Sequence, residues 1–155
     1  LNYISWDQAQ EYTRWLSRQY LGDYRLCTEA EWEYAARAEG QGRFGCGTEV
    51  KCLNQHAWHS HNLSQPGPQP VQRKQSNTWG LFDMQGNLWE WVQDYYAPLV
   101  TETVTQPSGP KEGILRTVRG GSYRNQPESL KLWKRGGNPP KMRQDYLGFR
   151  VCADP

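Results

Sequence analysis

The stretches RLCTEAEWEYAAR at 25–37, GLFDMQGNLWEW at 80–91, RGGSY at 119–123 and LGFR at 147–150 decide the fold. The first of them contains the order Thr28-Glu29-Ala30-Glu31, in which Thr28 and Glu31 can each satisfy a backbone N–H of the other. Such a capping box marks the start of a helix. We therefore predict a helix that begins after Thr28 and stops before Gly40.

Upstream of this stretch, residues 5–20 carry the clearest helical pattern of the chain. Ser5 and Gln8 form a second capping box, and Gly22 follows the last periodic residue. Apolar side chains recur at helical spacing and predict one apolar face, formed by Trp6, Ala9, Tyr12, Trp15 and Leu16.

Downstream, short apolar runs lie between long segments without periodicity. Residues 43–78 and 97–113 are rich in turn-forming residues and are predicted as loops. Residues 81–92 mix strand and turn, 116–123 read as a strand that ends at Gly120-Gly121, and 147–152 as a final strand. Two helices followed by short strands predict an α+β domain. Five tryptophans of the recurring phrases are predicted core residues: Trp6, Trp15, Trp32, Trp89 and Trp91.

Composition bounds the class of protein. Hydrophobic residues make up 36% of the 155 residues, and eight Trp and nine Tyr supplement the few aliphatic side chains. A net charge of +2 with no basic stripe argues against a nucleic-acid partner. No apolar run approaches the length of about 20 residues that spans a membrane.

Four cysteines allow three pairings if all are oxidised. Cys46 and Cys52 flank a short loop that contains glycine, so a local disulfide is plausible and would leave Cys27 to pair with Cys152. Four reduced, buried thiols are the alternative. The even count favours a secreted, periplasmic or cell-surface protein.

In their fixed order, the phrases at 25–37, 80–91, 119–123 and 147–150 resemble the formylglycine-generating enzyme (sulfatase-modifying factor) family. The resemblance runs from Ile4 to about Asp154. It implies a C-type-lectin-like fold with two helices, short strands and long irregular loops that metal ions stabilise. The family domain begins further upstream, so we expect residues 1–155 to be one such domain without its N-terminal part, attached to further domains.

One departure from the family concerns its chemistry. The resemblance places the two active-site cysteines of the oxidase at Asn125 and Leu130. Neither side chain supplies the thiolate that Cu(I) selects. Formylglycine oxidase activity is therefore not expected of this chain.

The resemblance also implies calcium sites. Glu90 would supply a carboxylate, and Gln85, Gly86 and Leu88 would supply carbonyl oxygens, which are the ligands that calcium takes. A turn-capping role for Glu90 is the alternative. Asn62 and Leu63 resemble half of a second calcium site, although residues 64–76 contain no acid to complete it.

Three histidines, His56, His59 and His61, form a close cluster whose imidazoles could bind zinc or iron. They lie in a predicted loop, where such a cluster is more often incidental. A redox metal is therefore not expected.

The segment 122–146 combines aromatic and cationic side chains, a composition typical of interface hot spots. In this fold it lines the ligand-facing surface. We therefore expect a non-catalytic module that binds a protein or peptide here, and a solvated loop is the alternative. The predicted ligand-binding residues are Ser122, Arg124, Asn125, Gln126, Trp133, Arg135, Arg143 and Tyr146.

Two other functions are compatible with the resemblance. Relatives without the cysteine pair include metal-dependent oxidative enzymes. The variable ligand-binding proteins of diversity-generating retroelements use the same fold and segment. Adenine mutagenesis of Asn codons cannot produce Lys, Met, Trp, Gln or Glu, and this segment contains Gln126, Glu128, Lys131, Trp133, Lys141 and Met142.

Overall fold

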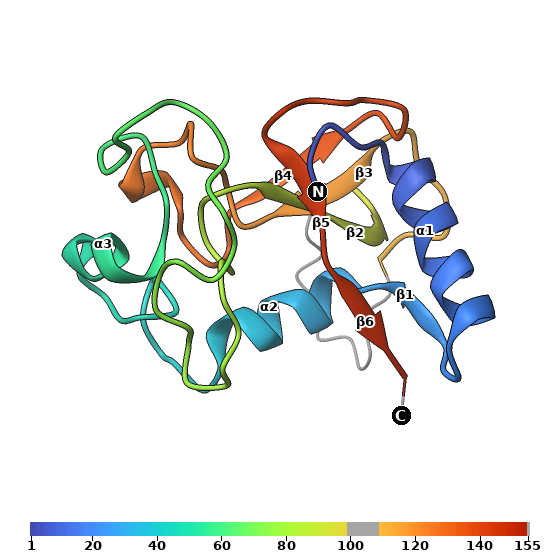
Figure 1. Cartoon of the computed structure of the whole chain (residues 1–155), viewed down its shortest axis with the longest axis horizontal. Coiled ribbons are helices and arrows are strands. Elements are labelled where there is room, and N and C mark those ends of the chain that lie inside the picture. Colours follow the sequence, from blue (N-terminus) through green and yellow to red (C-terminus); the bar gives the residue numbers. More distant parts are fainter. Residues whose placement is uncertain (99–108, 155) are drawn as a thin grey trace.

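The structure is a computed structural model that describes residues 1–98 and 109–154. Figure 1 shows two helices on the outside of a small central sheet and a largely irregular half that carries the short helix α3 (Leu53–His56). This mixture of helices, short strands and loops confirms the α+β class. The predicted loop at 97–113 lies mostly outside the described residues.

Both predicted helices form, and both begin at the predicted capping boxes. Helix α1 spans Trp6–Gln19, with Ser5 accepting a hydrogen bond from the backbone N–H of Gln8. Helix α2 spans Glu29–Arg37, with Thr28 accepting from the N–H of Glu31. Helix α2 ends at Ala38, which is left-handed (φ 43°), two residues before the expected glycine.

The central sheet has four strands in the order β4-β3-β2-β5. Strand β2 (Trp89–Tyr95) pairs antiparallel with β3 (Arg116–Arg119) and parallel with β5 (Leu147–Phe149), and β3 pairs antiparallel with β4 (Arg135–Asn138). Strand β3 ends at Arg119, earlier than predicted, because Gly120 and Gly121 both have positive φ.

The predicted final strand at 147–152 is two strands. Strand β5 stops at Phe149, and β6 (Val151–Ala153) pairs antiparallel with β1 (Tyr24–Leu26) in a separate two-stranded sheet. The chain changes sheets at Arg150. Its side chain contacts Glu90 of β2 and the carbonyl of Phe82.

Residues 43–78 are mainly irregular, as predicted, but contain two short helices. The 3₁₀ helix η1 spans Val50–Cys52 and leads directly into α3. A second 3₁₀ helix, η2, spans Pro127–Ser129 within the segment predicted to bind ligand.

The core consists of three apolar clusters. Trp32 and Trp91 are almost fully buried, while Trp6 and Trp89 pack against the cluster of Trp91, as predicted. The prediction is wrong for Trp15, which is 44% exposed. The buried positions of α1 are Ala9 and Thr13, so the ring of Trp15 lies against Tyr12 on the outside of the helix.

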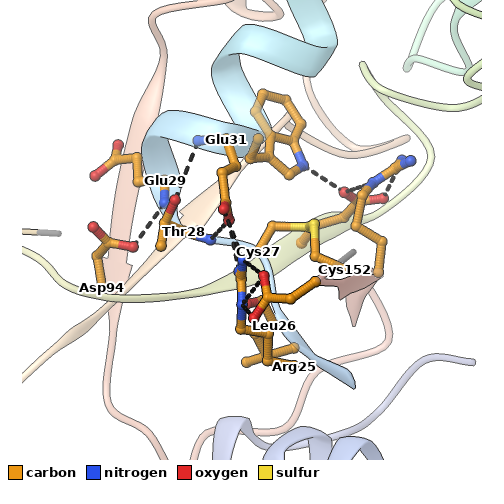
Figure 2. The surroundings of a disulfide bond; sticks show 12 residues. Arg25, Leu26, Cys27, Thr28, Glu29, Glu31, Asp94 and Cys152 are labelled. Carbon is orange, nitrogen blue, oxygen red and sulfur yellow. Dashed lines mark hydrogen bonds and ion pairs between the residues drawn. A yellow bond between two sulfur atoms is a disulfide. The ribbon is translucent and has the colours of Figure 1, made fainter. Parts of the chain in front are cut away.

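Two disulfides join the four cysteines in the predicted pairing. Cys27–Cys152 links residues 125 apart in sequence, and Cys46–Cys52 closes a loop between residues only 6 apart. Figure 2 shows the Cys27–Cys152 bridge beside Arg25, whose guanidinium points toward Glu31. This bridge fixes β1 to β6, close to the C-terminal end of the chain.

Among the described residues, every helix is too short or too polar to cross a lipid bilayer.

Candidate functional site

Glu90, the predicted calcium ligand, lies at the centre of the fold, and its carboxylate is already paired. Arg150 donates to both oxygens, from Nε at 2.6 Å and from Nη2 at 2.8 Å. The indole N–H of Trp32 also donates to Oε2 at 2.6 Å. Glu90 is only 8% exposed. Its negative charge is therefore compensated without a metal ion.

Asp83 is an acidic neighbour that the sequence analysis missed. Its Oδ2 accepts the N–H of Gln72 at 2.9 Å, whereas Oδ1 is buried without a partner among the described residues. Burial raises the pKa of Asp83, and the charge of Glu90 raises it further. A bound cation would satisfy this oxygen. The signal was present in the sequence, because Asp83 precedes Gly86 by three residues in the same phrase.

Other predicted calcium ligands have structural roles for their side chains. The Gln85 amide donates to the carbonyl of Leu130 and accepts the N–H of Gly45 at 2.8 Å. The Asn62 amide accepts the N–H of His59 at 2.9 Å and donates to the carbonyl of Ala57 at 2.8 Å. These bonds involve side chains only. A cation in the turn at 83–90 would rely on Asp83 and on the main-chain carbonyls of Gln85, Gly86 and Leu88, which are the kind of oxygen ligand that calcium takes.

The three histidines do not form one cluster of ligands. His59 is buried, with Nε2 3.1 Å from Asn54 Oδ1 and Nδ1 accepting the N–H of His61 at 3.3 Å. Burial lowers the pKa of His59. His56 instead lines a separate cavity of about 20 Å³, large enough for one water. Within residues 1–98 and 109–154, no three His, Cys, Asp or Glu side chains are placed to share a metal ion.

Asn125 and Leu130, the two positions singled out in the sequence analysis, lie near one another on either side of Gly121. A Cβ at Gly121 would overlap the Leu130 side chain and lie 3.6 Å from Asn125 Oδ1. Leu130 is 1% exposed and belongs to an apolar cluster with Phe44 and Leu53. The Asn125 side chain accepts hydrogen bonds from the backbone and the hydroxyl of Ser122.

Ser122 is therefore a buried turn residue, 1% exposed. Its hydroxyl accepts the N–H of Arg124 at 3.3 Å, and the Asn125 carbonyl accepts the N–H of Ser60 at 3.0 Å. These bonds fix the 122–125 turn against the 60–67 loop. They leave neither Ser122 nor the Asn125 amide oxygen directed at solvent.

An open groove begins beside this turn. We call it the Arg124 groove, and its volume is about 520 Å³. Seven residues line it: Ser60, Leu63, Pro66, Gly67, Tyr123, Arg124 and Asp145. One wall is uncharged and comes from the 60–67 loop, while the other carries an ion pair and an aromatic ring.

The charged wall is a connected set of hydrogen bonds. Arg124 donates from Nη2 to Asp145 Oδ2 at 2.6 Å and from Nε to the Tyr123 hydroxyl at 3.0 Å. The Tyr123 hydroxyl in turn donates to Asp145 Oδ2 at 3.0 Å. The guanidinium also lies 5.1 Å from the ring centre of Tyr146. Arg124 and Tyr146, two of the predicted ligand-binding residues, are thus brought together.

Other predicted ligand-binding residues lie outside this groove. Arg135 is paired with Glu29 at the start of α2, with Nε 2.5 Å from Oε1. Trp133 is 47% exposed, and the ammonium of Lys131 lies 5.8 Å from its ring centre. Gln126 and Arg143 are exposed without side-chain partners among the described residues. The 122–146 segment is therefore not one continuous surface.

Comparison with known proteins places the chain among relatives of very similar fold. Residues 1–155 match the profile of the sulfatase-modifying factor enzyme 1-like domain. A formylglycine-generating enzyme of Streptomyces coelicolor is 33% identical over 98% of this chain. The serine/threonine-protein kinase pkn1 of Chlamydia caviae is 33% identical over 97% of it. The solved structure of Treponema denticola variable protein 1 superposes with a TM-score of 0.94 at 25% identity, covering all of this chain and 71% of that one.

The chain spans only part of these relatives, 52% of the Streptomyces enzyme and 23% of the kinase. In both, the matching region is one part of a longer protein. The match over the full chain nevertheless shows the family directly: this protein belongs to the sulfatase-modifying factor (formylglycine-generating enzyme-like) family, with the C-type-lectin-like fold of that family.

Proposed function

We propose that this chain is a non-catalytic recognition module that binds a protein or peptide in the Arg124 groove. One observation carries the proposal. At the two positions that the resemblance assigns to the family's thiols, Asn125 forms a turn and Leu130 fills the core, while an open groove lies next to that turn.

The groove has the properties of a peptide site. Its volume lies within the range of about 300–1,000 Å³ typical of ligand sites. It combines an apolar wall at Leu63 and Pro66 with an exposed arginine and a tyrosine, a composition enriched at interface hot spots. The fixed turn at 122–125 holds the charged wall in place without a ligand, which reduces the entropy lost on binding.

Peptide display tests the proposal. Random dodecapeptides are selected on the immobilised chain, and the enriched sequences are synthesised and measured by fluorescence anisotropy. Arg124→Ala is expected to weaken binding at least about tenfold, since hot-spot arginines contribute 2 kcal/mol or more (about 30-fold). Arg14→Ala, an equal charge change on the exposed side of α1, should leave affinity unchanged.

Three outcomes would oppose the proposal. No enriched peptides, or equal losses in the two variants, would remove the groove as the binding site. Oxygen consumption that depends on copper and on a thiol-containing peptide would replace binding by catalysis, and would favour a metal-dependent oxidative enzyme.

A variable ligand-binding protein is the second candidate, and the superposition on Treponema denticola variable protein 1 favours it. Under this proposal, the gene should differ between isolates mainly at exposed positions of 122–146. Sequencing the gene from many isolates of the source population tests it. Uniform sequences at these codons would exclude this candidate and leave the fixed recognition module.

We also propose that calcium binds the 83–90 turn through Asp83. If so, calcium at about a hundredfold above its dissociation constant stabilises the fold by about 2.7 kcal/mol. Thermal unfolding with calcium and with a chelator measures this, with Asp83→Asn expected to abolish the difference. Asp23→Asn, an exposed aspartate, is the control. A wild-type melting temperature that ignores calcium would disprove the site.

A further inference from the structure

The ion pair in the Arg124 groove is unusual because it lies open to solvent yet is fixed from several sides. The Arg124 and Asp145 side chains are 53% and 42% exposed. Ordinary surface pairs of this exposure are loosely held and contribute little. Here the Tyr123 hydroxyl contacts both partners, and the rings of Tyr123 and Tyr146 flank the guanidinium.

The main chain of Asp145 is fixed as well. Its carbonyl accepts the side-chain N–H of Asn2 at 2.9 Å, and the neighbouring carbonyl of Gln144 accepts the N–H of Tyr3 at 3.1 Å. Residues from the start of the chain therefore fix the backbone that carries this carboxylate, whose Oδ2 forms the ion pair while Oδ1 is buried without a partner among the described residues. A ligand could move the Asp145 carboxylate away from Arg124 only by also breaking its hydrogen bond with the Tyr123 hydroxyl and shifting the fixed backbone.

The ion pair of Arg124 with Asp145 has no net charge, yet Arg124 keeps N–H groups that are free to donate. Arginine carries five N–H donors, and Nε and one hydrogen of Nη2 are occupied here. No side chain of the described residues accepts from Nη1 of Arg124. These hydrogens can bind an oxygen of a ligand. A ligand carboxylate would lie close to Asp145, and like charges placed together at an interface are strongly disfavoured.

We propose that Asp145 determines the specificity of the groove: by neutralising Arg124, it selects neutral peptide segments bound through a main-chain carbonyl and rejects segments with an acidic side chain at that point. This inference rests on the proposed function. It adds that the ligand is uncharged where it contacts Arg124, and that Asp145 acts by repelling acidic ligands. Repulsion of the wrong ligand is a common basis of specificity.

The opposite wall agrees with a neutral ligand. Its four residues, Ser60, Leu63, Pro66 and Gly67, carry no charge. The only charged side chains in contact with a bound segment would thus be Arg124 and Asp145, whose charges neutralise each other. Removing the carboxylate alone should turn the same groove into a site for acidic peptides, because Arg124 would then be uncompensated.

Parallel selections test this. One dodecapeptide library is selected on the wild-type chain, on Asp145→Asn and on Asp154→Asn. Asp154→Asn is the matched control. Asp154 is also an exposed aspartate paired with an arginine, Arg25, but it follows β6 and does not line the groove. Peptides enriched by each chain are sequenced, and a neutral peptide and its single-Glu derivatives are measured by anisotropy.

We expect wild type and Asp154→Asn to enrich neutral peptides, and Asp145→Asn to enrich peptides with Asp or Glu. The best single-Glu derivative should bind Asp145→Asn about tenfold more tightly than wild type. The same charge preference in all three chains would overturn the role of Asp145 and leave the proposed function standing. No enrichment on the wild type would overturn both.

Salt dependence of the wild-type chain gives an independent test that needs no variant. Binding of a neutral peptide to a neutral pair should change by less than about twofold between 50 and 500 mM NaCl, because screening weakens mainly the attraction of net charges. A loss of about tenfold or more would show recognition of an anionic ligand and would contradict the proposal.

Discussion

The surroundings of the two disulfides differ in how they are built. Around Cys27–Cys152, charged residues from distant parts of the chain pair with one another: Arg25 with Glu31 and Asp154, Glu90 with Arg150, and Arg119 with Glu29 and Glu33. Around Cys46–Cys52, the packing is apolar and the helices η1 and α3 are short. Leu130 of this apolar cluster lies in the same segment of the chain as Tyr123 and Arg124, which line the groove.

This difference separates the scaffold from the site. The paired charges join both sheets and α2, so a change at one residue leaves another buried charge without its partner. In the region beside the groove, Asn125 forms a turn and Leu130 fills an apolar cluster, with no ion pair that links them to distant parts of the chain among the described residues. The scaffold is therefore held mainly by distant ion pairs, and the region beside the groove by local bonds and apolar packing.

Breaking each disulfide tests this comparison most strongly. Replacing Cys27 and Cys152 together by Ser should lower the free energy of unfolding by about 4–5 kcal/mol, because the bridge closes a long loop. Replacing Cys46 and Cys52 should cost about 2 kcal/mol on the same chain-entropy argument. Denaturant unfolding measures both, and equal losses would contradict the division into scaffold and site.

Glu90→Gln should cause a loss of about 3 kcal/mol, between those expected for the two disulfides, because it leaves Arg150 without its hydrogen-bonded carboxylate in the interior. The loss should be the same with calcium and with a chelator if the pair with Arg150, and not a metal ion, compensates the charge of Glu90. Chemical unfolding under both conditions measures it. A loss seen only with calcium would return Glu90 to the role of a metal ligand.

Much of the scaffold could be predicted from local sequence. Ser5 with Gln8 and Thr28 with Glu31 each lie within one turn, so the helix starts could be read directly. The parallel pairing of β2 with β5 joins residues about sixty positions apart, and no local pattern specifies it. The switch of sheets at Arg150 was missed for the same reason.

The site was harder to predict. Arg124, Arg135 and Tyr146 were predicted to share one ligand-binding surface; the structure brings Arg124 and Tyr146 together, whereas Arg135 pairs with Glu29. Asp145 was missed because an aspartate gains its importance here from a contact with Arg124 that sequence cannot show. Trp15 was misplaced since its helical spacing matches that of buried residues.

A smaller effect is expected from acid on the scaffold. The hydrogen bond from Arg25 lowers the pKa of Glu31 to about 2. Because the folded pKa lies below the unfolded value, the stabilisation is present above about pH 4.5 and is lost as pH falls toward 2. The side chain is 43% exposed, so screening reduces the contribution to about 1 kcal/mol.

Glu31→Gln checks this directly. The variant should be about 1 kcal/mol less stable than wild type at pH 7, and most of this difference should be lost by pH 2, where about half of the wild-type carboxylate is protonated. Urea unfolding across this range provides the comparison. A difference that persists unchanged at pH 2 would mean that packing, and not the Arg25 pair, accounts for it.

The smallest effects on stability are expected at the surface of the site, where binding should change instead. Trp133→Ala and Arg124→Ala should each alter the free energy of unfolding by less than about 1 kcal/mol, because both side chains are about half exposed. Their effects on peptide affinity separate two versions of the binding surface. If the ligand occupies only the Arg124 groove, Arg124→Ala weakens binding and Trp133→Ala does not. If both variants weaken binding, the ligand extends from the groove to Trp133. The binding surface would then include both Arg124 and Trp133, even though Arg135, which is paired with Glu29, lies outside it.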